Sequence, residues 1–237
     1  MLTAWLTPSS FLFASSLMAN DRNFSVAPAL LLALALLGGT AQASGGSPES
    51  SSCQFTAFVE ETDPAGLNVR AEPAPTAKVL GKLPSVWSDG SGLRVRVRVG
   101  VTASANGWFK IREAADDDML TGQAPRPVYK GEGWVSGRKL VVKSQAKAGR
   151  AAPTPRAPAG IRLQDDPLFD GDSTVAPGRP VDCRGRWVQV EYEEARFPAD
   201  LRPLQIAAAA RAGVPKGRFR TWLNKICGIQ ETSCDGL

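Results

Sequence analysis

Between residues 66 and 142, short stretches of alternating apolar and polar side chains recur, with turn residues between them. Leu67 and Val69 alternate with polar residues, and Leu93–Val99 alternates strictly, with leucine and valines on one side and three arginines on the other. Successive side chains of a strand point to opposite faces, so each stretch predicts a strand with one buried face. The expected strands are 66–70, 77–83, 93–99, 107–112 and 133–142.

The first expected strand is followed by "AEPAP", residues 71–75. Proline fixes φ and has no N–H to donate, so this segment predicts a stiff loop outside the ladder. Five short strands with a long first loop can close into a small barrel, which leaves no exposed sheet edge. The pattern therefore predicts an all-β fold for residues 55–143.

The segment 144–160 is rich in proline, alanine and arginine and shows no apolar periodicity, so we interpret it as a linker. Beyond it, residues 161–237 repeat the order of the first unit less cleanly. An insertion at about Ala195–Gly217 interrupts this second unit, and its "LQIAAAARAG" stretch predicts a short helix that ends at Gly213. The chain is thus expected to hold two diverged copies of one plan.

The N-terminal segment predicts a signal peptide. Val26–Leu37 is an apolar run shorter than the ~20 residues of a membrane-spanning helix. It is followed by Ala41-Gln42-Ala43, which fits the small-x-small pattern before a cleavage site. We therefore expect a signal peptide over residues 1–43, with Met18 as an alternative start.

After this signal peptide, residues 44–54 have the composition of a flexible leader. The competing interpretation is an uncleaved anchor helix over Phe24–Ala43. Cleavage after Ala43 leaves no membrane span and predicts a periplasmic or secreted protein.

Composition excludes several kinds of site. The chain has 28 basic and 23 acidic side chains, a net charge of +5, and no histidine. This charge is mild and spread along the chain, so it does not require nucleic acid as a partner. Without histidine or a Cys-x-x-Cys pair, neither a zinc site nor any other metal or cofactor is expected.

Four cysteines follow the signal peptide: Cys53, Cys183, Cys227 and Cys234. An even number in an exported chain predicts two disulfides. Cys227 and Cys234 could pair locally, or Cys183 could pair with one of them and leave Cys53 for the other. The sequence does not choose between these pairings.

The stretches "LNVRAEPAPTAKVLGKLP", "GWFKIR" and "GEGWVSGRKL" together resemble the bacterial Src-homology-3-like (SH3-like) domain family over Gly66 to Leu140. Two departures are the insertion Glu113–Lys130 and Lys139-Leu140, where the family has "YL". The second unit matches only at "GRWVQV" and "TWL" and looks like a degenerate copy. The resemblance implies two five-stranded barrels with a targeting or ligand-binding role, in several family members toward peptidoglycan.

An enzyme is not expected. The commonest general base is absent, and no serine lies in a nucleophile motif such as G-x-S-x-G. The acidic run Asp116–Asp118 is interpreted as a solvated loop, because three consecutive carboxylates do not converge on one point. A cell-wall enzyme accessory is accordingly the least favoured interpretation.

Alternation places two tryptophans on the faces opposite the core side chains. In 107–112, Trp108 is expected to face outward beside Lys110 and Arg112, and Trp187 occupies the same position in 186–192. The candidate ligand-binding residues are Trp108, Lys110, Arg112, Arg70 and Trp187. The alternative is that the proline loop folds over Trp108 and buries it. Trp134 and Trp222 are expected in the core, and the arginines of 93–99 on a solvated face.

These features predict an exported, non-catalytic binding protein of the bacterial cell envelope. Its expected partner is cell-wall glycan or stem peptide, or an envelope protein. The alternative is an interaction or assembly module that grips a protein partner through the insertions Glu113–Lys130 and Ala195–Gly217. The oligomeric state is not indicated.

The export hypothesis makes a direct prediction about thiols. Titration of the unfolded, unreduced mature protein with a thiol reagent should detect no free thiol, since all four cysteines are expected in disulfides. Four free thiols would contradict export into an oxidising compartment.

Overall fold

The structure is a computed structural model, and it describes residues 50–164, 168–230 and 234. The chain divides into two units, Met1–Ser44 and Gly45–Leu237, and only the second contains described residues. The expected signal peptide and most of the leader lie outside the described residues. No helix within the described part is long and apolar enough to cross a membrane.

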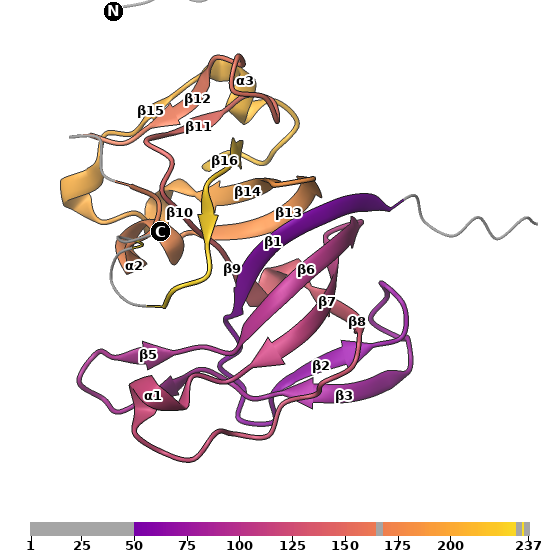
Figure 1. The fold of residues 1–237 in the computed structure, drawn as a ribbon. Coiled ribbons are helices and arrows are strands. Elements are labelled where there is room, and N and C mark those ends of the chain that lie inside the picture. The colour runs from indigo at the N-terminus through magenta and orange to yellow at the C-terminus, as the bar shows by residue number, and fades with distance from the viewer. Residues whose placement is uncertain (1–49, 165–167, 231–233, 235–237) are drawn as a thin grey trace, which may run out of the picture. The chain divides into compact units, whose positions relative to one another are not determined.

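The first half of the described unit is built on an antiparallel sheet. Among the described residues this sheet has seven strands in the order β3-β2-β8-β7-β6-β1-β9 (Figure 1). They are β1 Ser51–Val59, β2 Leu67–Arg70, β3 Val79–Leu83, β6 Arg98–Ala105, β7 Trp108–Ala115, β8 Gly133–Ser136 and β9 Leu140–Val141. A separate hairpin and two short helices complete it: β4 Trp87–Ser88 with β5 Arg94–Val95, α1 Asp118–Thr121 and η1 Gly137–Lys139.

The second half has a sheet of six strands within the described ranges, in the order β13-β14-β16-β11-β12-β15. They are β11 Ala148–Arg150, β12 Ala159–Arg162, β13 Gly178–Arg184, β14 Trp187–Glu193, β15 Gln205–Ile206 and β16 Arg218–Leu223. A two-stranded pair and four short helices surround it: β10 Lys143–Ser144 with β17 Ile226–Cys227, α2 Asp172–Val175, η2 Glu194–Arg196, η3 Ala199–Leu201 and α3 Ala208–Arg211. The short helix expected in the second insertion is α3, and Gly213 after it has a positive φ of 70°.

The all-β class is confirmed, because strands dominate the described residues and the helices span three or four residues each. The closed five-stranded barrels are not confirmed. In the first half the sheet has seven strands, and no pairing between its end strands β3 and β9 is found among the described residues.

The two halves repeat one topology. The order β3-β2-β8-β7-β6 in the first sheet corresponds to β12-β11-β16-β14-β13 in the second. Their first hairpin loops also match: Arg70 Nη1 donates to the Ala77 carbonyl at 2.7 Å, and Arg150 Nη1 donates to the Ala157 carbonyl at 3.2 Å. Main-chain bonds from Ala71 to Lys78 and from Ala151 to Pro158 close the two loops alike.

This repeat changes the interpretation of residues 144–160. The segment expected to be a linker contains β11 and the second proline loop, and β11 pairs with both β12 and β16. The second copy of the hairpin therefore starts at Ala148, and not at Ile161 as predicted from the sequence. The apolar periodicity is missing because Gly149 packs so closely that an added Cβ would lie 2.2 Å from Thr221 Oγ1.

Buried side chains of both halves belong to one continuous core. In the first half, Phe55 and Phe109 meet edge to face with ring centroids 6.0 Å apart. In the second, Tyr192 stacks on Phe219 at 5.3 Å. The same cluster includes Cys183 between them, so the halves do not have separate cores.

A disulfide joins the halves at β1. Cys53 in β1 bonds to Cys183 in β13, and Cys227 bonds to Cys234. Two main-chain bonds accompany the first disulfide, from Gln54 N to the Gly185 carbonyl at 2.8 Å and from Gly185 N to the Ser52 carbonyl at 2.9 Å. This result selects the local pairing of Cys227 with Cys234 that the sequence left open.

The structure corrects the prediction that the arginines of residues 93–99 lie on a solvated face. Val95, Val97 and Val99 are buried as predicted, but Arg96 is buried too. Its Nε lies 2.5 Å from Glu60 Oε2, and the same carboxylate binds Arg94. Burial of two charged groups is tolerated because they pair and hydrogen-bond with each other.

The main chain of Arg96 is bound by the C-terminal segment. Gln230 Oε1 accepts from Arg96 N at 2.5 Å, and Gln230 Nε2 donates to the Arg96 carbonyl at 2.6 Å. The side-chain amide thus satisfies both main-chain groups of Arg96, as a neighbouring strand would.

Asp116, the first residue of the acidic run after β7, has a structural role. The Asp116 carboxylate, whose side chain is 2% exposed, binds Arg126 through Nε and Nη2 at 2.9 and 2.6 Å. Burial opposes the charge of Asp116, but the hydrogen bonds and charge of Arg126 outweigh it and lower the pKa of the carboxyl. The pair closes the insertion 113–130 on itself, so a fully solvated loop is the wrong description.

The two disulfides should contribute unequally to stability. Replacing Cys53 and Cys183 with serine should lower the free energy of unfolding by about 2–5 kcal/mol, because their bond closes a loop of long sequence separation in the unfolded chain. Replacing Cys227 and Cys234, which are separated by 7 residues, should cost less. Urea unfolding of both double variants tests this, and the reverse order would contradict it.

Asp116→Asn should lower the free energy of unfolding at pH 7 by about 1–3 kcal/mol, because it weakens charged hydrogen bonds to Arg126. The pKa of Asp116 is lowered from 3.8 on folding, so its contribution is complete above that value and is lost as the pH falls through the folded pKa. The difference from wild type should therefore shrink in urea titrations near pH 3. Asp118→Asn is the matched control, and equal stability of the two variants at pH 7 would refute the role of Asp116.

Candidate functional site

The outer face of β7, β8 and β2 carries two tryptophans. Trp108 pairs with Ser136, and Trp134 pairs with Lys110 on one side and Arg70 on the other. These five residues share a face, because directly paired residues of neighbouring strands point to the same side. Both indoles are half-buried, whereas the alternating core residues Phe109, Ile111 and Val135 are fully buried.

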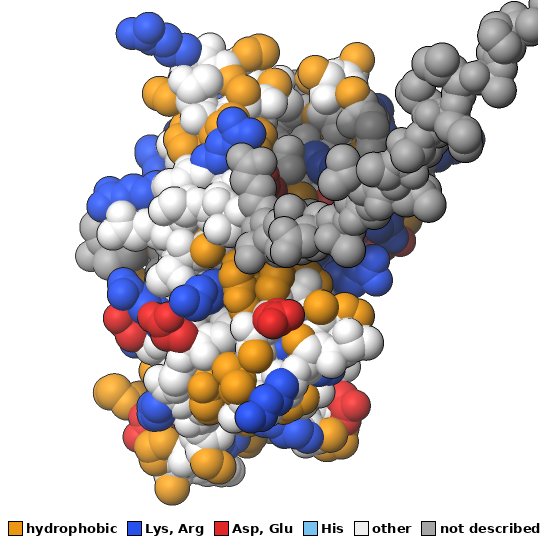
Figure 2. Space-filling model, turned by 90° about the vertical axis from the view of Figure 1, so that its right-hand side faces the viewer, with side chains coloured by type: hydrophobic (Ala, Val, Ile, Leu, Met, Phe, Trp, Pro, Cys, Tyr) orange, Lys and Arg blue, Asp and Glu red, His pale blue; other side chains and the backbone are white. Residues whose placement is uncertain are grey.

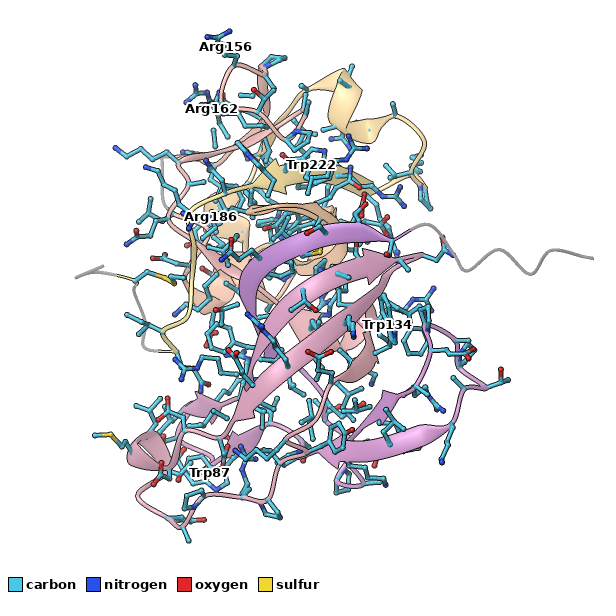
Figure 3. The ribbon with its side chains drawn as sticks, turned by 45° about the vertical axis from the view of Figure 1, so that its right-hand side comes forward. Trp87, Trp134, Arg156, Arg162, Arg186 and Trp222 are labelled. Carbon is cyan, nitrogen blue, oxygen red and sulfur yellow. A yellow bond between two sulfur atoms is a disulfide. The ribbon has the colours of Figure 1, made fainter. Side chains whose placement is uncertain are left out.

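The outward orientation predicted for Trp108 is confirmed, and the core position predicted for Trp134 is wrong. Gly133, the residue before Trp134, faces inward, where an added Cβ would lie 2.5 Å from Val69 Cγ1. Only glycine fits there, so Trp134 must point to the other face (Figure 3). The two indoles are diagonal neighbours on adjacent strands and form one aromatic stripe.

The three cations predicted near Trp108 each have a partner. Lys110 Nζ lies 2.8 Å from Glu132 Oε2, Arg112 Nε lies 3.4 Å from Glu113 Oε1, and Arg70 donates to its own loop. Both ion pairs are exposed enough to be weak. Lys110 and Arg70 flank Trp134, because each of them pairs with it across the sheet.

The second half places its tryptophans differently. Trp187 is half-buried and outward, as predicted from the buried Val188, Val190 and Tyr192. Trp222, at the position equivalent to Trp134, is 6% exposed, which confirms its predicted burial. The Arg184 guanidinium lies 6.0 Å from the centre of its ring, a cation–π contact that helps to cover the indole.

A cleft of about 1300 Å³ lies where the two halves meet. From the first half, Trp108, Ser136 and Pro75 line it, and from the second half β13, β14, η2 and β16 contribute. Pro75 of the "AEPAP" loop and Trp108 are thus both wall residues of one cleft, and Trp108 keeps part of its surface exposed. Of the five residues predicted to bind ligand, only Trp108 lines this cleft; Lys110, Arg112, Arg70 and Trp187 do not.

The cleft carries an excess of positive charge. Six arginines and three carboxylates line it, a net charge of +3: Arg138, Arg179, Arg184, Arg196, Arg218 and Arg220 against Asp182, Glu191 and Glu193. Glu191 is already neutralised, because its two oxygens lie 2.9 and 2.8 Å from Arg218 and Arg220. Burial opposes its charge, but these hydrogen bonds outweigh it and lower its pKa. Elsewhere on the surface, Lys and Arg are scattered among apolar side chains on the face drawn in Figure 2.

The described residues contain no group of three or more metal-ligating side chains.

Both insertions are packed against their own sheets. Tyr129 covers Gly81 and donates its main-chain N–H to Lys82, while β15 pairs with β12 at the corresponding edge. Met119, in the first insertion, is 91% exposed.

Sequence reasoning missed the cleft because its walls come from segments far apart in the chain. The arginines of β13 and η2 belong to no motif, and the halves must be assembled before they approach Trp108.

Comparison with protein-family models, curated proteins and solved structures found no match to this chain.

Proposed function

We propose that the protein is an exported, non-catalytic binding protein of the bacterial cell envelope that holds a wall polymer against its aromatic stripe. Two disulfides are consistent with an oxidising compartment such as the periplasm or the exterior. The observation that carries the proposal is the pair of half-buried indoles, Trp108 and Trp134, on one face with Lys110 and Arg70 beside them.

This arrangement suits a polymer that alternates rings with acidic groups. An indole offers a broad apolar surface on which a sugar ring or a peptide side chain can pack. The neighbouring cations can attract carboxylates through weak, salt-sensitive contacts. Peptidoglycan, with glycan rings and acidic stem peptides, combines both chemistries and is the ligand we propose.

The alternative of a partner-gripping module draws support from one observation, the exposure of Met119 in the first insertion. Deleting the insertion 113–130 is no clean test of it, because the deletion also removes the Asp116–Arg126 pair and the Tyr129 contact with β3. Met119→Ser is the cleaner variant for that proposal.

Sedimentation with purified peptidoglycan sacculi tests the wall proposal. Trp108→Ala and Trp134→Ala should each weaken binding by about tenfold or more, the cost of losing an aromatic side chain at the centre of an interface.

Trp87→Ala is the matched control, because it removes a half-buried indole from the separate β4–β5 hairpin (Figure 3). Circular dichroism confirms that each variant is folded. Absence of wild-type retention at low salt, or equal retention by all three variants, would rule out the wall-binding proposal.

A further inference from the structure

Four arginines in the cleft have no carboxylate partner among the described residues: Arg138, Arg179, Arg184 and Arg196. Arg184 lies over the Trp222 ring, which leaves Arg138, Arg179 and Arg196 for a ligand. Arg138 lies in η1 of the first half, Arg179 in β13 and Arg196 at the end of η2. They therefore approach the cleft from both halves. The side chains of Arg138 and Arg196 are exposed, and that of Arg179 is partly buried.

Arg179 is held in position by neutral acceptors only. Its Nη1 donates to the carbonyls of Ala176 and Gly178 at 2.8 and 2.6 Å, and its Nε donates to the Arg138 carbonyl at 3.1 Å. Carbonyl groups orient a guanidinium but leave its positive charge in place. Its Nη2 has no acceptor in the described part of the chain, so one edge of the fork is open to a ligand.

The surroundings of Arg179 lower the pKa of its guanidinium. Burial lowers the pKa of its guanidinium, and the nearby positive charge of Arg196 lowers it further. Glu191 is the neighbour of Arg179 across β13 and β14, yet both of its oxygens are engaged by Arg218 and Arg220. The sheet therefore pairs Arg218 and Arg220 with a carboxylate, whereas Arg179 forms no ion pair among the described residues and only the charge of Glu60 partly opposes the lowering of its pKa.

We propose that Arg138, Arg179 and Arg196 form a receptor for one oxyanion, a carboxylate or a phosphate, carried by a ligand that occupies the cleft. Guanidinium groups bind both kinds of oxyanion through paired N–H donors. The cleft is much larger than a free ion, and Trp108 in its wall offers a surface for the remainder of the ligand. The identity of that remainder rests on the function proposed above, whereas the oxyanion site does not.

Isothermal titration of the mature, disulfide-bonded chain with inorganic phosphate and with acetate, at constant ionic strength in chloride, tests the site. The wild type should bind at least one of the two ions at a single site, and the preferred ion tells a phosphate-bearing from a carboxylate-bearing ligand. Arg138→Gln and Arg196→Gln should each weaken that binding by about tenfold or more, as expected for the loss of a charged hydrogen bond. Both side chains are exposed, so neither variant removes a core contact.

Arg186→Gln is the control, because Arg186 is an equally exposed arginine of the β13–β14 turn outside the cleft (Figure 3). Binding of neither ion by the wild type, or equal losses in all three variants, would overturn the oxyanion site. A chain that binds sacculi through Trp108 but neither ion would overturn this site alone. A chain that binds phosphate or acetate in an Arg196-dependent way but is not retained by sacculi would overturn the wall proposal alone.

Discussion

The covalent bond between Cys53 and Cys183 sets where the two halves of the molecule meet. It fixes β1 of the first sheet to β13 of the second, and the main-chain bonds between β1 and Gly185 align the two strands beside it. Ser104 Oγ donates to Asp182 at 2.7 Å in the same region. The cleft opens beside this junction, so the attachment of β1 to β13 helps to hold its arginines and Trp108 in their relative positions.

The repeat allows the face that carries Trp134 to be compared with the equivalent face of the second half. Both copies place a tryptophan opposite the arginine that begins the proline loop, Trp134 with Arg70 and Trp222 with Arg150. In the second copy Arg184 lies over the indole. This copy also carries three of the four cysteines and a longer insertion. In the first copy the indole stays half-exposed. The surface suited to a ligand therefore belongs to the first copy, while the second contributes the charged wall of the cleft.

The sequence predicted what depends on alternation within a single strand. It placed Phe109 and Val188 inside and Trp108 and Trp187 outside, and the structure agrees. It failed where a contact from another strand decides the outcome. Gly133 faces inward, where it packs against Val69, and Gly149 lies in a strand that packs against Thr221. Arg96 is buried because its guanidinium pairs with Glu60. The cleft lay beyond sequence reasoning for the same reason, since β13 and η2 approach Trp108 only in the assembled unit.

The bond between Gln230 and Arg96 has a consequence for how the chain reaches this structure. These residues are 134 positions apart, and the second disulfide closes the chain around Gln230 by joining Cys227 to Cys234. The segment between β5 and β6 is thus completed by residues that are synthesised long after it. Contacts of such long range form slowly, because a large loop must close before they contribute. The first half, although it precedes the second in the chain, acquires its final hydrogen bonds only after Gln230 has been synthesised.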